Sequence, residues 1–169
     1  SDVMLPNSSN PNGIAVGDWN GNGRVDIAVT LEDLDQVQII DNPPTGPFAL
    51  GDVYDVGRRP VHLIAARLDA GSPELGLVTT NLEDDSISVL MPAGGGLFGT
   101  AVNVTVGNEP RETAAGDLDE DGDVDLAVAV TEANQVLILV NDGVGNLTNG
   151  PALSMAVLEP ESVVLGDLD

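Results

Sequence analysis

The feature that most constrains this chain is an internal repeat of about fifty residues. Four prolines mark its register at spacings of 49, 50 and 50 residues: Pro11, Pro60, Pro110 and Pro160. The same register relates Asp18, Arg67, Asp117 and Asp167. A period of this size is typical of one supersecondary unit stacked on copies of itself. We therefore expect residues 1–169 to form a single repeat array.

Each repeat contains short apolar runs separated by turn residues, without the 3.6-residue periodicity of a helix. The chain has 20 glycines and 11 prolines, which favour many tight turns. The pattern predicts four strands per repeat. In chain order the predicted strands are Ile14–Gly17, Ile27–Thr30, Val37–Asp41 and Val53–Val56, then His62–Ala66, Leu75–Thr79, Ile87–Met91 and Val102–Val106, then Thr113–Gly116, Leu126–Val130, Val136–Val140 and Ser154–Val157. Four antiparallel strands in about 50 residues are the blade of a β-propeller, so we expect an all-β fold.

The repeat boundaries predict three complete blades and parts of two more. The complete blades would be residues 12–59, 60–109 and 110–159. Residues 1–11 would end a preceding blade with a strand at Val3–Leu5, and residues 160–169 would begin a following one with a strand at Ser162–Gly166. Because a closed propeller needs about four blades or more, we expect a partial propeller. Its open apolar faces would favour self-association.

Two acidic loops follow the first predicted strand of the first and third repeats. Residues Asp18–Asp26 and Asp117–Asp125 both read D-x-[DN]-x-[DN]-G-x-x-D. Side-chain oxygens at positions 1, 3, 5 and 9, with a main-chain carbonyl at position 7, suit Ca²⁺, which takes six to eight oxygen ligands. The predicted ligands are Asp18, Asn20, Asn22, Asp26 and the carbonyl of Arg24 in one loop, and Asp117, Asp119, Asp121, Asp125 and the carbonyl of Asp123 in the other.

Other interpretations of these loops fit less well. Mg²⁺ needs a smaller and stricter octahedron, and Zn²⁺ prefers His or Cys ligands. An EF-hand would place a bidentate Glu at position 12, where this chain has Val29 and Val128. The remaining alternative is a pair of metal-free turns, in which four or five carboxylates would repel one another.

The corresponding loops of the second and fourth repeats are incomplete. The second begins with Arg67 and is one residue shorter, so we expect it to bind no calcium. Arg67 either replaces the metal by pairing with Asp69 or Glu74, or points into solvent. At the end of the chain, residues 166–169 repeat only the opening of the motif.

The charge of the chain excludes some classes of partner. Its net charge is −23, and all five cationic residues are arginine, so nucleic acid and anionic membrane surfaces would be repelled. We expect no membrane insertion, because no apolar stretch approaches the length of a span. There is no cysteine, hence neither a disulfide framework nor a thiolate site.

The sequence predicts no catalytic constellation. The only histidine is His62, on a predicted strand, and nothing around it in the sequence forms a triad, so we expect that the chain is not an enzyme. Aromatic residues make up only 2% of the chain, which argues against a sugar-stacking face. Trp19 is the one candidate, and we expect it to pack locally instead.

The chain resembles the FG-GAP/VCBS repeats of integrin-α-like propellers. The resemblance rests on the two acidic loops, on the Val-Gly-x-x-Pro runs at Val56–Pro60 and Val106–Pro110, and on the Phe48 and Phe98 segments. The resemblance implies structural calcium sites and ligand binding on other surfaces. We therefore expect a calcium-stabilised, extracellular or cell-surface β-propeller module for adhesion or for recognition of a protein or glycan ligand. The alternative is an accessory propeller portion of a secreted polysaccharide-degrading enzyme.

Overall fold

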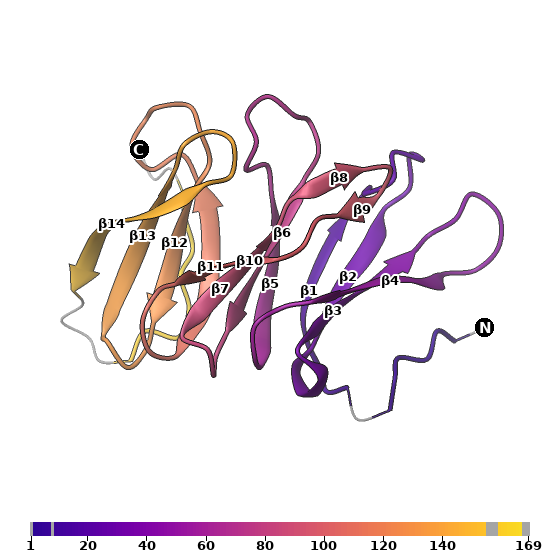
Figure 1. Cartoon of the computed structure of the whole chain (residues 1–169), viewed down its shortest axis with the longest axis horizontal. Coiled ribbons are helices and arrows are strands. Elements are labelled where there is room, and N and C mark those ends of the chain that lie inside the picture. The colour runs from indigo at the N-terminus through magenta and orange to yellow at the C-terminus, as the bar shows by residue number, and fades with distance from the viewer. Residues whose placement is uncertain (1, 8, 155–158, 167–169) are drawn as a thin grey trace.

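The computed structural model describes residues 2–7, 9–154 and 159–166. In these residues the chain forms three four-stranded antiparallel sheets, one two-stranded ribbon and one 3₁₀ turn at Glu32–Leu34, with no α-helix. The three sheets stand side by side in chain order, like neighbouring blades of a propeller (Figure 1). The all-β, propeller-like architecture expected from the repeat is thus confirmed.

Consecutive strands pair within each sheet. The first sheet has β1 (Pro11–Gly17), β2 (Asp26–Leu31), β3 (Gln36–Asp41) and β4 (Ala49–Asp55); the second has β5 (Pro60–Ala66), β6 (Gly76–Asn81), β7 (Ser86–Leu90) and β10 (Val102–Thr105); the third has β11 (Pro110–Gly116), β12 (Asp125–Val130), β13 (Gln135–Asn141) and β14 (Leu147–Ser154). Eleven predicted strands overlap these observed strands. Of the twelfth, Ser154–Val157, only Ser154 lies within the described residues, at the end of β14.

The ribbon between β7 and β10 was not predicted. It consists of β8 (Pro92–Gly94) and β9 (Leu97–Phe98), which pair antiparallel across a glycine turn. The runs are too short to stand out as strands in a sequence, because alternation cannot be recognised over two or three residues.

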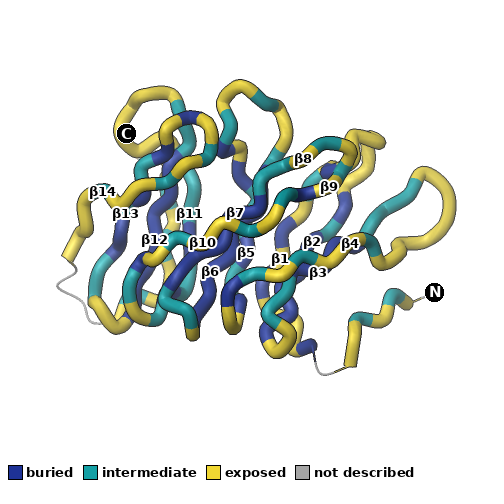
Figure 2. The backbone as a smooth tube through the Cα atoms, viewed as in Figure 1, coloured by how far each residue is buried: buried dark blue, intermediate teal, exposed yellow. Residues whose placement is uncertain are grey.

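The core lies between the sheets. One cluster joins the first and second sheets through residues such as Ala28, Leu63 and Leu77, and another joins the second and third through Val78 and Leu126. All six residues of β6 are buried, since this strand is covered on both faces (Figure 2). A strand covered on both faces is apolar or neutral throughout. This explains why β6 lacks the alternation of apolar and charged residues that a half-exposed strand shows.

The strands β1, β5 and β11 lie next to one another along the inner side of the array. They approach most closely at Gly13, where an added Cβ would stand 2.7 Å from the backbone nitrogen of Leu63. Gly13 is therefore required by backbone contact between the first and second sheets.

A hydrogen bond repeated three times ties each sheet to the next repeat. Residues before the repeat prolines adopt positive φ, and so do residues in the hairpin between the second and third strands of each sheet. In each case the hairpin side chain accepts a hydrogen bond from the backbone N–H of the next pre-proline residue. The pairs are Arg59 to Asp35 at 2.8 Å, Glu109 to Asp85 at 3.2 Å and Glu159 to Asn134 at 2.8 Å. Asp and Asn suit the hairpin positions because they tolerate the left-handed conformation.

Two predicted strands at the ends are not strands. Val3–Leu5 and Ser162–Gly166 form no ladder with any described residue. A strand requires a paired neighbour, and no described strand lies beside either segment in register. Val3 and Leu5 instead pack against the outer face of the first sheet, over Leu31 and its neighbours.

Candidate metal centre

Both acidic loops connect the first and second strands of their sheets, and strand register fixes their ends. In the first sheet Gly17 pairs with Asp26, and in the third Gly116 pairs with Asp125. The residue at position 9 of each loop therefore stands beside the residue that precedes position 1. The fold thus brings the first and last predicted ligands together without any contribution from the metal.

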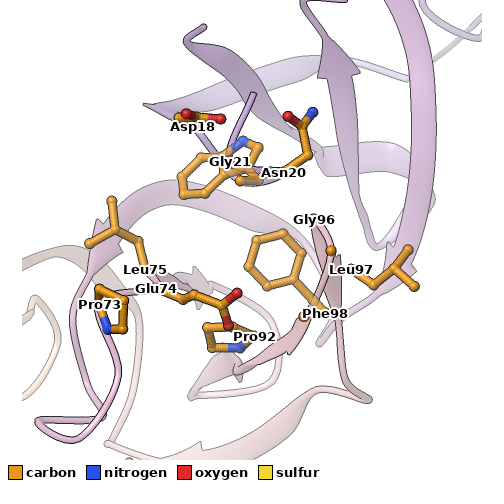
Figure 3. A pocket seen from close by; sticks show the side chains of 13 residues that line it. Asp18, Asn20, Gly21, Pro73, Glu74, Leu75, Pro92, Gly96, Leu97 and Phe98 are labelled. Atoms are coloured by element: carbon orange, nitrogen blue, oxygen red, sulfur yellow. The ribbon is translucent and has the colours of Figure 1, made fainter. Parts of the chain in front are cut away.

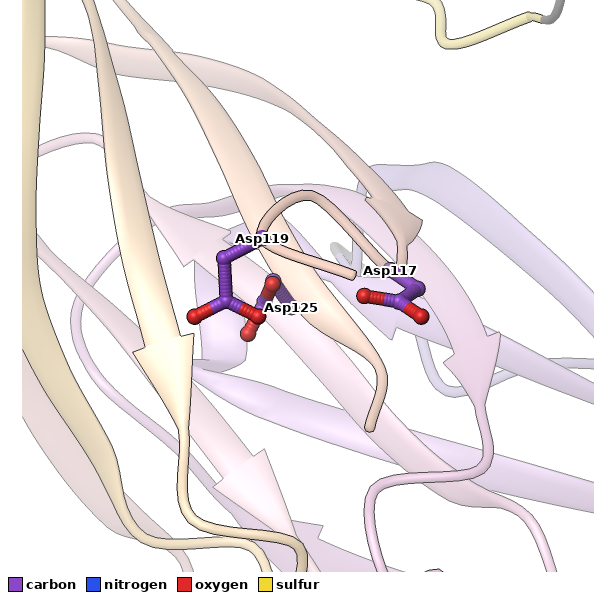
Figure 4. Close-up of side chains that lie close together, drawn as sticks. All are labelled: Asp117, Asp119 and Asp125. Carbon is purple, nitrogen blue, oxygen red and sulfur yellow. The ribbon is translucent and has the colours of Figure 1, made fainter. Parts of the chain in front are cut away.

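In the third-repeat loop three carboxylates converge. One oxygen from each of Asp117, Asp119 and Asp125 lies within 4.8 Å of the others (Figure 4). Asp125 is fully buried at the base of the loop, while Asp117 and Asp119 are exposed. Asp121, the predicted position-5 ligand, is outside this cluster, and its Oδ1 accepts a hydrogen bond from the backbone N–H of Asp123 at 2.9 Å.

Main-chain donors hold the third-repeat loop in shape. The carboxylate of Asp117 accepts from the N–H groups of Glu120 at 2.8 Å and Gly122 at 3.1 Å. Gly122 adopts φ +96°, as expected for position 6, and Glu120 adopts φ +66°. Each carboxylate oxygen has two lone pairs, so these hydrogen bonds leave acceptor capacity for a cation.

The charges of this loop are not balanced within it. Partial desolvation and repulsion from Asp121 raise the pKa of Asp119 above its usual value. The same two causes, with further repulsion from Asp117, Asp125 and Asp142, raise the pKa of Asp123. Carboxylates under mutual repulsion favour a bound cation, because the cation stabilises their charged forms.

The first-repeat loop has the same backbone but is closed by side-chain contacts. Asp18 accepts from the N–H groups of Asn22 at 3.0 Å and Gly23 at 2.8 Å. The amide nitrogen of Asn20 donates to Asp26 at 3.1 Å. A metal here would need the Asn20 amide to turn its oxygen toward that carboxylate. The guanidinium of Arg24 reaches outside the loop, which leaves only the main-chain carbonyl for the predicted position-7 role.

Two asparagines support the loops and were missed by sequence reasoning. The backbone N–H of Asn42 donates to Asp26 at 2.7 Å, and that of Asn141 donates to Asp125 at 2.9 Å. Each side-chain amide also donates to the carbonyl before the position-9 aspartate. At the equivalent register the second repeat has Gly76 in place of the position-9 aspartate and Pro92 in place of the asparagine, so it lacks both groups. This joint loss of Asp and Asn was the available sequence signal.

The second-repeat loop is held by its neighbour rather than by an internal cation. Arg67 is exposed, and no ion pair joins it to Asp69 or Glu74 in the described part of the chain, so the pairing hypothesis is wrong. The carbonyl of Leu68 accepts from the side chain of Asn141 at 2.8 Å. Ala70 N–H donates to the carbonyl of Gly143 at 2.9 Å. The β13–β14 hairpin of the third sheet therefore supplies hydrogen-bond partners for the backbone of this loop.

A cavity of about 460 Å³ lies beside the first-repeat loop (Figure 3). Its wall includes Trp19 and Phe98, whose rings meet edge to face with centroids 5.8 Å apart. Trp19 is only 8% exposed, and the expectation that it packs locally is confirmed. Its indole therefore contributes to the core between the first two sheets instead of offering a ring face to solvent.

Comparison with known proteins gives structural likeness alone. No family model matches the chain, and no curated protein matches its sequence. A protein of unknown function from Desulfotomaculum acetoxidans superposes with TM-score 0.68 at 19% identity, over 91% of this chain and 44% of that one. The periplasmic gluconolactonase of Pseudomonas aeruginosa superposes with TM-score 0.62 at 21% identity, over 89% and 41%. Hydrazine synthase of Kuenenia stuttgartiensis superposes with TM-score 0.65 at 16% identity, over 94% of this chain and 39% of that one. The chain spans less than half the length of each.

The prediction that the chain is not an enzyme is wrong. It rested on the lack of a recognisable triad around His62, and the gluconolactonase is an enzyme with the same fold. This architecture therefore supports catalysis, and a missing sequence motif does not exclude it.

Among the described residues, no helix has the length and apolar character needed to cross a bilayer.

Proposed function

We propose that the chain is a calcium-stabilised propeller module of the FG-GAP/VCBS type, which recognises a protein or glycan ligand outside the cell. The observation that carries the proposal is the convergence of Asp117, Asp119 and Asp125 on one point of a nine-residue loop. A matching backbone occurs in the first repeat, where strand register again brings the loop ends together. A site repeated on equivalent loops is typical of a structural metal in a repeat array.

Calcium fits the donor set better than other common cations. All the side-chain ligands of the two loops are oxygen atoms, and the loops are largely exposed, so they can widen to admit a large ion. Ca²⁺ accepts six to eight oxygens at roughly 2.3–2.6 Å with flexible geometry. The proposed ligands are those of the sequence motif, with Arg24 and Asp123 contributing main-chain carbonyls.

The metal would have a structural role in this proposal. It would neutralise the repelling carboxylates and fix the loops at one end of the array, leaving other surfaces for the ligand. The net charge of −23 supports an environment where divalent cations are abundant, such as the outside of the cell.

Calorimetric titration of the chelator-treated chain with CaCl₂ tests the proposal. We expect calcium binding by the third-repeat loop to weaken in Asp119→Asn, which keeps a ligand oxygen of the kind that Asn20 offers in the first-repeat loop and removes one charge. Asp33→Asn is the matched control, because Asp33 is exposed on the 3₁₀ turn away from both loops. Absence of heat with CaCl₂, or equal loss in both variants, would contradict the calcium assignment.

A second candidate is an accessory propeller portion of a secreted polysaccharide-degrading enzyme. The structural likeness to a periplasmic gluconolactonase favours it, since that protein combines this fold with chemistry on a sugar lactone. A glycan array and an assay of polysaccharide cleavage by the full-length parent protein separate the two: cleavage supports the accessory portion of an enzyme, and saturable glycan binding without cleavage supports the recognition module.

A further inference from the structure

A second cavity, of about 530 Å³, lies at the far end of the inner strands from the metal loops. The strands β1, β5 and β11 begin at this cavity and end at the loop positions. Its polar wall is formed by Asn10, Asn12, Glu32, Arg59, His62, Arg111, Glu112 and Glu161. The only histidine and two of the five arginines of a strongly acidic chain therefore meet here.

The repeat framework does not explain these residue types. The proline at each inner-strand start, the positive φ before it and the hydrogen bond that the pre-proline N–H donates to the preceding hairpin recur from repeat to repeat. The residue after the proline does not recur: it is Asn12, Val61, Arg111 or Glu161. A folding requirement would act alike on equivalent positions, so the differences here point to chemistry at the cavity.

Part of the polar wall is already satisfied. Glu32 accepts hydrogen bonds from Arg59 Nε at 2.7 Å, Asn10 at 3.2 Å and Asn12 at 3.0 Å. This ion pair lowers the pKa of Glu32, and both charges are neutralised by each other. The cluster forms a rigid rim, and the ligand-binding capacity must come from the other groups.

Arg111 retains donors without good acceptors. Its Nε is buried and has no hydrogen-bond partner among the described residues, and its Nη2 lies 3.5 Å from Glu109. The backbone at this position is fixed, because the carbonyl of Arg111 accepts from Thr80 Oγ1 at 2.8 Å. The Arg111 side chain is nevertheless 39% exposed, so the accessible nitrogens of its guanidinium can donate to a ligand oxygen in the cavity.

His62 and Glu112 provide a donor and an acceptor side by side. The Nδ1 of His62 accepts from the backbone N–H of Thr113 at 3.3 Å, so the neutral ring carries its proton on Nε2. Burial lowers the pKa of His62, which favours this neutral form. The Nε2 lies 3.8 Å from Glu112 Oε1, too far for a hydrogen bond, so both atoms remain able to bind a group between them.

We propose that this cavity binds a neutral saccharide, an inference that rests on the proposed recognition function and names its site. Arg111 and His62 would donate to sugar oxygens, and Glu112 and Glu161 would accept from hydroxyl groups. An anion is disfavoured by the net charge of −23. Because Glu32 neutralises Arg59, the remaining charged groups of the wall are Arg111, Glu112 and Glu161, a mixture of donors and acceptors that suits the hydroxyl groups of a neutral polar ligand. Val61 and Leu82 in the same wall offer apolar contact to the C–H face of a sugar ring.

Saturation-transfer NMR with calcium-saturated chain tests the assignment. The probes are glucose, galactose, mannose and xylose, with glucuronate as the charged comparison. We expect transfer to at least one neutral sugar, and a roughly tenfold weaker affinity in Arg111→Gln and in Glu112→Gln, because each removes a charge-assisted hydrogen bond. Glu74→Gln, in the wall of the cavity beside the first-repeat loop, should bind like the parent.

Three results would overturn the assignment: no transfer to any neutral sugar, preference for glucuronate, or loss of binding in Glu74→Gln. CaCl₂ titration of the same samples separates this inference from the metal proposal. Loss of sugar binding with calcium binding retained in Arg111→Gln supports the cavity. Absent sugar binding in a parent chain that binds calcium contradicts the cavity alone, and absent calcium binding contradicts the metal proposal alone. Thermal melts confirm that each variant is folded.

Discussion

Truncation of Asn141 should destabilise the chain far more than the equivalent change in the first repeat. The Asn141 side chain is 2% exposed and donates to the carbonyls of Leu68 at 2.8 Å and Val124 at 3.0 Å, and it accepts from Gly145 N–H at 3.0 Å. Asn141→Ala removes all three bonds and leaves their partners without an acceptor or donor, with Leu68 buried and Val124 and Gly145 half-buried. At about 1 kcal/mol for each bond, the expected loss is about 3 kcal/mol.

Asn42→Ala is the matched control. Its side chain is half-buried and bonds Val25 and Arg24 near solvent, so water can replace it, and we expect a loss of about 1 kcal/mol or less. For a chain of this length, 1 kcal/mol corresponds to about 2–4 °C in Tm. Urea unfolding in the presence of EGTA measures both variants without a metal contribution. Equal losses, or a larger loss in Asn42→Ala, would refute the bridge between the second and third repeats.

Three further predictions concern the metal and the open faces. The third-repeat loop has four predicted carboxylate ligands and the first-repeat loop has two. CaCl₂ calorimetry should therefore show that Asp117→Ala loses the tighter calcium site and that Asp18→Ala loses the weaker one, and the reverse order would contradict the charge argument. Calcium should add about 1.4 kcal/mol per site at tenfold saturation, and the difference in Tm between calcium and EGTA should shrink as pH falls. In the metal-free folded state the pKa values of Asp119 and Asp123 are raised above 3.8, so this state binds more protons than the unfolded state and gains stability as pH falls. A Tm difference between calcium and EGTA that stays constant from pH 7 to 4 would refute this reasoning. Light scattering at micromolar concentration should show self-association through exposed apolar residues such as Ile14, Val16 and Leu153, and a stable monomer would contradict this.

The sequence predicted the strands because each repeat supplies an independent copy of the pattern. Ambiguity in one copy is limited by the others, so that the predicted strand Leu75–Thr79 differs from β6 by only one residue at its start and two at its end. The convergence of acidic side chains was predicted because these residues are close in sequence: Asp117, Asp119 and Asp125 lie within nine residues of one loop.

Contacts that join distant residues could not be predicted in this way. The bond from Asn141 to Leu68 spans 73 residues and depends on how the third sheet packs against the second. For Arg67 the sequence left two alternatives, pairing inside its own loop or exposure to solvent, because local charge is visible in a sequence and a neighbouring hairpin is not. The cavity around Arg111 also combines the starts of several inner strands, and no motif marks it.

The three loops show that this turn can be stabilised in two independent ways. The second-repeat loop has no acidic cluster and is bonded by the hairpin of the next sheet, through Asn141 and Gly143. The first-repeat loop has the motif and is also covered by the next sheet, since Gly96 of the β8–β9 turn packs so closely on Asn20 that a Cβ would lie 2.7 Å from it. The third-repeat loop has the most carboxylates, and it is approached by the β13–β14 hairpin of its own sheet, where an added Cβ on Gly143 would meet the carboxylate of Asp123. The second-repeat loop, which lacks the motif, is thus the one whose main chain is bonded directly by the side chain and backbone of the next sheet, and these bonds can replace the acidic motif in holding the turn.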